Sequence, residues 1–78
     1  MTVTIYTRQD HRAGTTVAWS NAGEPRTFPY EAVGFHEHAH AARCYVWATG
    51  AGVATTVSSR TPSGTFVHEI TIERSPLP

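Results

Sequence analysis

The residues best suited to chemistry are crowded into one short stretch, and three of them are histidines. The set comprises His36, Glu37, His38, His40 and Cys44. Imidazole nitrogens are common ligands of zinc and other divalent metals, and two of them four residues apart on a helix can bind one ion. On a helix His36 and His40 share a face, whereas on a strand all three histidines would share one. One hypothesis is therefore a divalent-metal site at His36 and His40, completed by His38 or by a second subunit.

The simpler interpretation of the same histidines, which we favour, is a solvated row near the start of a helix. A competent metal site needs a third protein ligand, and Cys44 lies about 80° further round a helix than His36. Histidine is also only a middling helix former, and short histidine runs occur without metal. We therefore expect no cofactor.

Two further residues, Arg43 and Trp47, continue the helix border on which His36 and His40 lie. Exposed tryptophan and arginine are enriched at the energetic centres of protein interfaces because both provide a large contact area. We therefore predict a partner-binding surface made of His36, His40, Arg43 and Trp47. The alternative is that Trp47 folds over the edge of a sheet and that Trp19 lies in the core.

The sequence lacks the usual sets of catalytic residues. No residue lies at a sequence spacing from Cys44 that marks it as a general base. The sole aspartate, Asp10, lies in an expected turn, so it does not indicate a Ser-His-Asp triad. Neither a Gly-x-Ser-x-Gly motif nor a glycine-rich phosphate loop is present. His68 is expected at the margin of the core. We predict that the protein is not an enzyme.

Composition restricts the classes of partner. The 78 residues include six basic and six acidic side chains, so the net charge is zero with neutral histidines, and the basic field of a nucleic-acid-binding protein is missing. A single cysteine excludes an internal disulfide, and we find neither a leader peptide nor an apolar run long enough to cross a membrane. We expect a cytoplasmic protein that binds neither membrane nor nucleic acid. All six basic residues are arginine, which suggests a GC-rich genome.

One helix, over residues 35–49, is expected to organise the chain. Five residues spaced for one helical face form its predicted core stripe, with Tyr45 and His38 along one border. They are Phe35, Ala39, Ala42, Val46 and Thr49. The helix should end at Gly50, which can adopt the positive φ of a C-terminal cap.

The rest of the chain is patterned as strands, expected at residues 2–8, 15–20, 26–31, 53–59 and 65–73. Residues 15–31 should form a hairpin turning at residues 21–24, with Trp19 on the Val17 face opposite Phe28 and Tyr30. Pro29 removes a backbone donor, so the third strand should be short or an edge. The order βββαββ predicts an α+β domain over residues 1–74, in which one helix packs on an antiparallel five-stranded sheet; residues 75–78 should be a frayed tail.

Residues 1–8 and 42–50, together with the total length, resemble small glutaredoxin-like electron donors. The resemblance implies a helix over residues 15–22 and a redox pair of cysteines. Residues 11–14 hold His-Arg-Ala-Gly where that Cys-x-x-Cys pair would lie, Thr55 stands where the family has its cis-proline, and the chain ends in a strand pattern. A glutaredoxin-like scaffold without the redox pair is therefore kept as an alternative to the antiparallel architecture.

These observations together favour a small non-enzymatic protein, an accessory or regulatory one, that binds another protein or itself, for example as a homodimer. The neutral charge and the missing catalytic set exclude other classes, and the tryptophan and arginine border provides a surface. Exposed strand edges also invite pairing with another chain. The competing hypothesis is a metal-binding protein that uses His36, His38 and His40.

Overall fold

A computed structural model of the chain describes residues 2–21, 23–29 and 35–74, with the side chains of Phe35, His36 and Arg74 left aside. Its elements follow the order βββαββ, as the sequence predicts. They are β1 (Thr2–Asp10), β2 (Thr15–Trp19), β3 (Arg26–Pro29), α1 (Phe35–Trp47), β4 (Gly52–Arg60) and β5 (Phe66–Arg74). The expected tail at residues 75–78 lies outside the described part.

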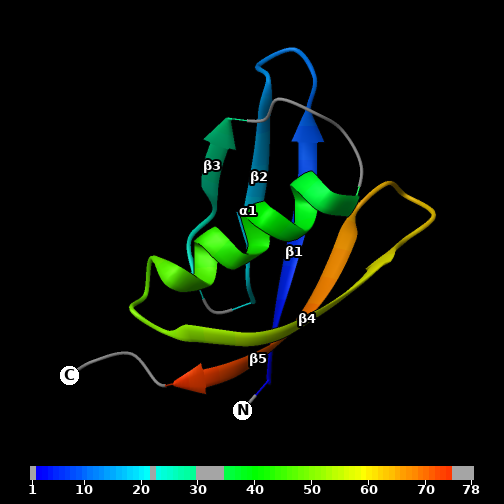
Figure 1. Cartoon of the computed structure of the whole chain (residues 1–78). Coiled ribbons are helices and arrows are strands. Elements are labelled where there is room, and N and C mark those ends of the chain that lie inside the picture. The colour runs from blue at the N-terminus through cyan, green and yellow to red at the C-terminus, as the bar shows by residue number, and fades with distance from the viewer. Residues whose placement is uncertain (1, 22, 30–34, 75–78) are drawn as a thin grey trace.

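All five strands form one antiparallel sheet in the order β3-β2-β1-β5-β4, and α1 crosses one face of it (Figure 1). The α+β class and the single helix on one face are thus confirmed. The central strand, β1, alternates as predicted: Ile5 and Thr7 are buried beneath the helix, whereas Arg8 is exposed. No helix in the described part of the chain is long and apolar enough to cross a membrane.

The β1–β2 connection is closed by Asp10 and Gly14. The Asp10 carboxylate accepts hydrogen bonds from the backbone N–H groups of Arg12 and Ala13, at 3.0 and 3.2 Å, and Gly14 has a φ of 66°. Aspartate followed by glycine is typical of tight turns for these reasons. Residues 15–19 are therefore a strand, and the helix that a glutaredoxin-like scaffold requires there is absent from this described segment.

The β2–β3 hairpin is confirmed, and Trp19 shares a face with Val17 as predicted, but the prediction that Phe28 lies opposite them is wrong. Phe28 pairs with Thr16, and both therefore face the helix, whereas Trp19 pairs with Tyr6 on the open face. The Tyr6 and Trp19 rings stack with centroids 5.8 Å apart. The small side chain of Ala18, fully buried, lies under the helix instead, because close packing of a helix on a sheet favours small residues at the contact. Trp19 is accordingly not a core residue, and Tyr30 lies outside the described residues.

The helix begins at Phe35 as predicted and ends at Trp47, with a turn over residues 48–50. Gly50 has a φ of 89°, and its N–H donates to the Trp47 carbonyl at 2.9 Å, so glycine caps the helix as expected. Ala42 and Val46 are buried as predicted, but the buried face is rotated toward the side of His38 and Tyr45. Thr49, expected in the core stripe, is exposed.

Strand β4 contains a bulge that changes its facing pattern. Register shifts occur between Gly52 and Val53 and between Val53 and Thr55. Val53 packs against the core, whereas Val57 is 68 % exposed and pairs with Glu69 of β5 on the open face. The expected common face of Val53, Thr55 and Val57 is thus broken, because the bulge adds a residue to one strand only.

Candidate functional site

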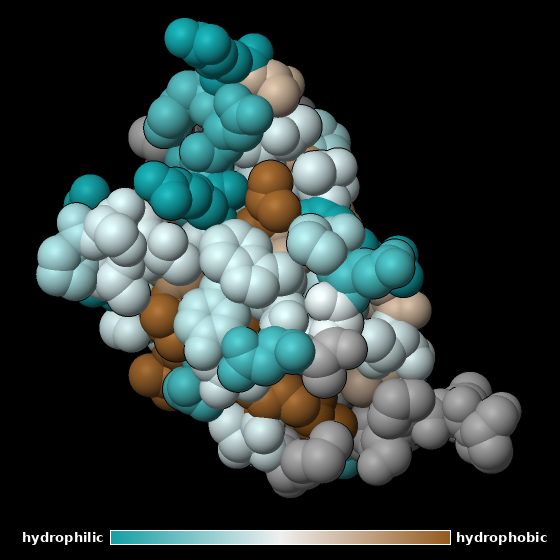
Figure 2. Space-filling view, turned by 180° about the vertical axis from the view of Figure 1, so that it is seen from behind, coloured by the Kyte–Doolittle hydropathy of each residue, from teal (hydrophilic) through white to brown (hydrophobic). Residues whose placement is uncertain are grey.

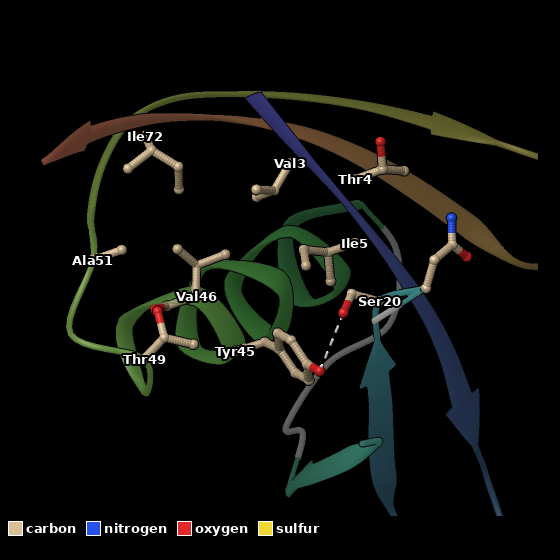
Figure 3. A pocket seen from close by; sticks show the side chains of 10 residues that line it. Val3, Thr4, Ile5, Ser20, Tyr45, Val46, Thr49, Ala51 and Ile72 are labelled. Carbon is tan, nitrogen blue, oxygen red and sulfur yellow. Dashed lines mark hydrogen bonds between the residues drawn. The ribbon is translucent and has the colours of Figure 1, made fainter. Parts of the chain in front are cut away.

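An apolar pocket of about 480 Å³ opens between the C-terminal half of α1 and the strands beneath it (Figure 3). Val3, Ile5, Val46 and Ile72 come from three different elements and point into the same space. Other lining residues are Thr4, Ser20, Asn21, Tyr45, Thr49 and Ala51. A single helix leaves such a gap because it is narrower than a five-stranded sheet. An apolar pocket with a few polar groups at its rim can receive a small apolar molecule or side chain.

Tyr45 forms one wall of this pocket and is held by its hydroxyl group. The hydroxyl donates to the backbone carbonyl of Glu24 at 2.9 Å and lies 3.5 Å from the Ser20 hydroxyl (Figure 3). Ser20 in turn accepts a hydrogen bond from the Gly23 N–H at 3.0 Å. A Cβ atom at residue 23 would clash with the Tyr45 hydroxyl, so glycine allows this contact.

A chain of four polar side chains runs beneath the N-terminal half of α1. Thr7 Oγ1 lies 2.7 Å from His38 Nδ1 and 2.8 Å from His68 Nε2, and Ser58 Oγ lies 2.7 Å from His68 Nδ1. Thr7 and His68 are fully buried and His38 is 3 % exposed. The sequence predicts His68 at the margin of the core, and this prediction is wrong. His68 can be fully buried because Thr7 and Ser58 provide hydrogen-bond partners for both of its ring nitrogens. We name these residues the polar chain.

Thr7 and Ser58 are functional-site residues that the sequence did not predict, and His38 was expected on the border of the helix. Threonine and serine are common in strands, and nothing in their spacing marks them as partners of histidine. The alternation of β1 and β5 does place Thr7 and His68 on the same face as Ile5 and Ile70. Thr7 and His68 are thus two polar residues on the buried faces of neighbouring strands. This is the one feature of the sequence from which a buried hydrogen bond could be predicted.

Both histidines of the polar chain favour the neutral form. Burial lowers the pKa of His68 to about 4 from its ordinary 6.5, and His38 and Arg43 act in the same direction. Burial also lowers the pKa of His38, with further contributions from the charges of Arg60 and His11. The polar chain is therefore uncharged near neutral pH.

The protons of a neutral polar chain can be arranged in two directions. In the first, Thr7 donates to His38 Nδ1 and accepts from His68 Nε2–H, while Ser58 donates to His68 Nδ1. In the second, every one of these bonds is reversed. The His38 Nε2 atom carries a proton in the first arrangement and is an acceptor in the second, because a neutral imidazole has one N–H.

His38 also lines a second hollow, of about 490 Å³, near the β1–β2 turn. The His38 ring stacks on the Phe66 ring, with centroids 3.8 Å apart and an angle of 13° between the ring planes. The Arg60 guanidinium lies 5.9 Å from the centre of the same Phe66 ring. The remaining lining residues are Arg8, Gln9, His11 and Gly64. We name this hollow the basic corner, because the described residues that line it include two arginines and two histidines but no carboxylate.

The helix border predicted to bind a partner is partly described. Trp47 is 48 % exposed, His40 is exposed and Arg43 is half-buried. Tyr45, on the opposite border, contacts the β2–β3 connection, so Arg43 and Trp47 lie on the side of α1 that is nearer β4. The side chain of His36 lies outside the described part.

Two of the histidines considered as metal ligands, His38 and His40, are separated. His38 points into the sheet, where it contacts Thr7, whereas His40 is exposed and its Nε2 atom lies 3.6 Å from Cys44 Sγ. Within the described ranges no three histidine, cysteine, aspartate or glutamate side chains are grouped so that they could hold a metal ion. His38 therefore does not complete a site with His40.

The two edges of the sheet differ. Strand β3 has four residues and ends in Pro29, as predicted for a short edge strand. Strand β4 has nine residues, with no proline, and its single charged residue is Arg60 at its end. Short strands and proline protect an edge from pairing, so β4 is the less protected edge.

The sheet face opposite the helix is open. Figure 2 shows hydrophobic side chains scattered over it among weakly polar ones, while strongly hydrophilic side chains gather at the end that carries the β1–β2 turn. Tyr6, Trp19 and Val57 lie on this face.

Comparisons with known proteins gave no relative of this chain. No family model matches it, and no match was found among the curated proteins or the solved structures.

Proposed function

We propose that the protein is a small non-enzymatic binding module that associates with another protein chain along β4, and that its first partner is a second copy of itself. The observation that supports this proposal is the nine-residue edge strand with its exposed Val57. The outer edge of such a strand presents backbone N–H and C=O groups that a further strand can pair with. The other edge, β3, is short and contains Pro29, so growth into a fibre is disfavoured.

Two copies can pair in an antiparallel manner about a two-fold axis, the commonest symmetry of homodimers. With the axis at Val57, the Val57 side chains of the two copies lie opposite each other, and Thr55 lies opposite Ser59. The two Arg60 residues are then about 20 Å apart, from six residues at the strand rise. The paired segment is otherwise uncharged, so no like charges meet.

The helix border belongs to the same surface. Arg43 and Trp47 lie on the side of α1 nearer β4, so pairing of β4 brings the two helices toward each other on one side of a continuous sheet. The half-exposed Trp47 then provides the contact area that a strand edge lacks. His40 and Arg43 form the polar rim expected around such a contact.

Light scattering during size-exclusion chromatography, over a range of protein concentrations, tests the proposal. We expect a dimer for the wild type and a monomer for Val57→Lys, because the substitution places two ammonium groups opposite each other at the axis. Thr27→Lys is the matched control, since it adds the same charge to an exposed position of β3, the other edge. A monomeric wild type, or equal loss of the dimer in both variants, would overturn the proposal.

Cross-linking gives an independent test of the register. In a Cys44→Ser background, Val57→Cys is expected to form a disulfide-linked dimer under mild oxidation, because the two sulfurs then face each other across the axis. Ala54→Cys, also exposed on β4, is the control and should cross-link slowly. Faster cross-linking at residue 54 would contradict this register.

A further inference from the structure

We propose that the basic corner binds a small oxyanion, the phosphate or carboxylate group of a small molecule, against Arg60 and the Nε2 atom of His38. The site shares Arg60, the last residue of β4, with the edge strand, but it requires no second subunit. Its chemistry comes from the side chains that converge near the β1–β2 turn and from the polar chain behind them.

The charges of the basic corner are of one sign. Arg60 is an exposed cation on its wall, and His11 lies beside it; Arg8, which pairs with Val17 on the open face of the sheet, is an exposed cation at its margin. The nearest acid along β1 is Asp10, whose carboxylate accepts the backbone N–H groups of Arg12 and Ala13 in the turn. An anion in the hollow therefore meets cationic side chains in a protein of zero net charge.

The electrostatic effect on His38 points the same way. Burial is the main cause of the lowered pKa of His38; the charges of Arg60 and His11 add to it, so both contribute a positive potential at this ring. The same contributions that disfavour a proton on His38 favour an anion beside it. The site thus offers favourable charge without requiring His38 itself to be protonated.

The geometry leaves one nitrogen of His38 for a ligand. Thr7 occupies Nδ1, and Nε2 has no hydrogen-bond partner among the described residues. The ring is fixed between Thr7 and the face of Phe66. Gly64, which also lines the hollow, has a φ of 87°, and a Cβ there would meet no atom within 4 Å among the described residues.

An oxyanion selects one of the two proton arrangements of the polar chain. It accepts a hydrogen bond from His38 Nε2–H, so Thr7 must donate to His38 Nδ1 and accept from His68 Nε2–H, and Ser58 must donate to His68 Nδ1. Binding is therefore reported at His68, which the anion does not touch. The tautomer of the buried His68 therefore reports on binding in the basic corner, and loose association of ions with the surface should not change it.

Nuclear magnetic resonance at pH 7 and constant ionic strength tests the site, with sodium phosphate replacing sodium chloride. We expect saturable amide shifts confined to residues around the basic corner, and His68 ¹⁵N shifts that approach the Nε2–H tautomer. A second titration with succinate separates the sources: saturation by both ions indicates general oxyanion binding, and saturation by one identifies the group. No saturable shift with either ion would overturn the proposal.

The matched variants are Arg60→Gln and Arg26→Gln. The first removes a cation from the basic corner, and we expect it to weaken binding about tenfold or more, as for loss of one charge-assisted hydrogen bond. The second removes an exposed cation from β3, at the far edge of the sheet, and should leave binding unchanged. Equal weakening by both variants would show an adventitious ion only, held by overall charge.

Discussion

The hydroxyl oxygen of Thr7 lies 2.7 Å from Nδ1 of His38, although the two residues are 31 positions apart in the chain. This contact ties the first turns of α1 to the central strand of the sheet. It also explains why the buried face of the helix is rotated: a histidine with a buried partner can enter the core, whereas one without a partner cannot.

Removal of the Thr7 hydroxyl should therefore destabilise the fold. Thr7→Val preserves the shape but leaves His38 Nδ1 and His68 Nε2 without their shared partner, and we expect a loss of about 2–4 kcal/mol in the free energy of unfolding. Urea denaturation measures it. Thr4→Val is the control: its hydroxyl donates to the Glu69 carboxylate at an exposed position, and its loss should cost under about 1 kcal/mol. Equal losses would contradict the importance of the polar chain.

Stability should fall as the solution is acidified below the ordinary pKa of histidine. The pKa of His68 is lowered to about 4 in the folded protein, so the unfolded chain binds more protons between pH 6.5 and 4. The stabilisation that neutral His68 contributes to the free energy of unfolding is complete above pH 6.5, falls as the pH is lowered and is lost once the pH has fallen through about 4. Its full size is on the order of 3 kcal/mol. His38, whose pKa is also lowered, acts in the same direction.

Urea midpoints at a series of pH values measure this effect. His68→Gln should show a smaller loss of stability between pH 7 and 4.5 than the wild type, even where it is less stable at neutral pH. His40→Gln removes an exposed imidazole and should keep the slope of the wild type. An unchanged slope in His68→Gln would show that other groups cause the acid sensitivity.

The strands, the hairpins and the helix could be predicted because they depend on local pattern. Alternation in β1 and β5, the turn at Asp10 and Gly14, and the cap at Gly50 each act within a few residues. These signals also separated the antiparallel sheet from a glutaredoxin-like scaffold at residues 15–19.

The candidate sites depend on contacts between distant residues and could be predicted only in part. Trp47 and His40 are exposed as expected, since helical spacing determines a border. The partner of His38 could not be found, because it requires the strand order and the crossing position of α1. The face of Phe28 depended on the register between β2 and β3, and the face of Val57 on a bulge that leaves no mark in the alternation of β4.

Substitution of Gly23 should destabilise the protein as long as Tyr45 has its hydroxyl group. A Cβ at residue 23 would clash with that hydroxyl, so Gly23→Ala should destabilise the protein by about 1–3 kcal/mol through forced movement of the ring. Tyr45→Phe alone should cost about 1 kcal/mol, because it loses the hydrogen bond to the Glu24 carbonyl. The double variant should be no less stable than Gly23→Ala, since the clash is gone. Additive losses in this double-mutant cycle would contradict the contact.

Zinc should not bind the isolated subunit tightly. His40 and Cys44 offer two ligands 3.6 Å apart, and His38 is held by Thr7 inside the protein, so a third ligand is missing among the described side chains. Calorimetric titration of about 50–100 μM protein at neutral pH should give no saturable heat, although a competent site would saturate there. Saturable heat that His40→Gln abolishes, and that His11→Gln keeps, would instead establish a metal site that includes the predicted His36 and His40.

Trp47 and Trp19 should have opposite effects on association and folding. Trp47 is 48 % exposed, so Trp47→Ala should weaken the proposed dimer at least about tenfold, as hot-spot residues do, and change the stability of the isolated subunit little. Trp19 stacks on Tyr6 on the open face, and Trp19→Ala should lower the free energy of unfolding by about 1–3 kcal/mol while the dissociation constant stays within about twofold. Sedimentation equilibrium measures the first quantity, and urea denaturation of dilute protein the second, because dimer formation makes apparent stability depend on concentration. If Trp47→Ala destabilises the subunit and leaves the dimer intact, Trp47 is a packing residue, and the helix border is not part of the interface.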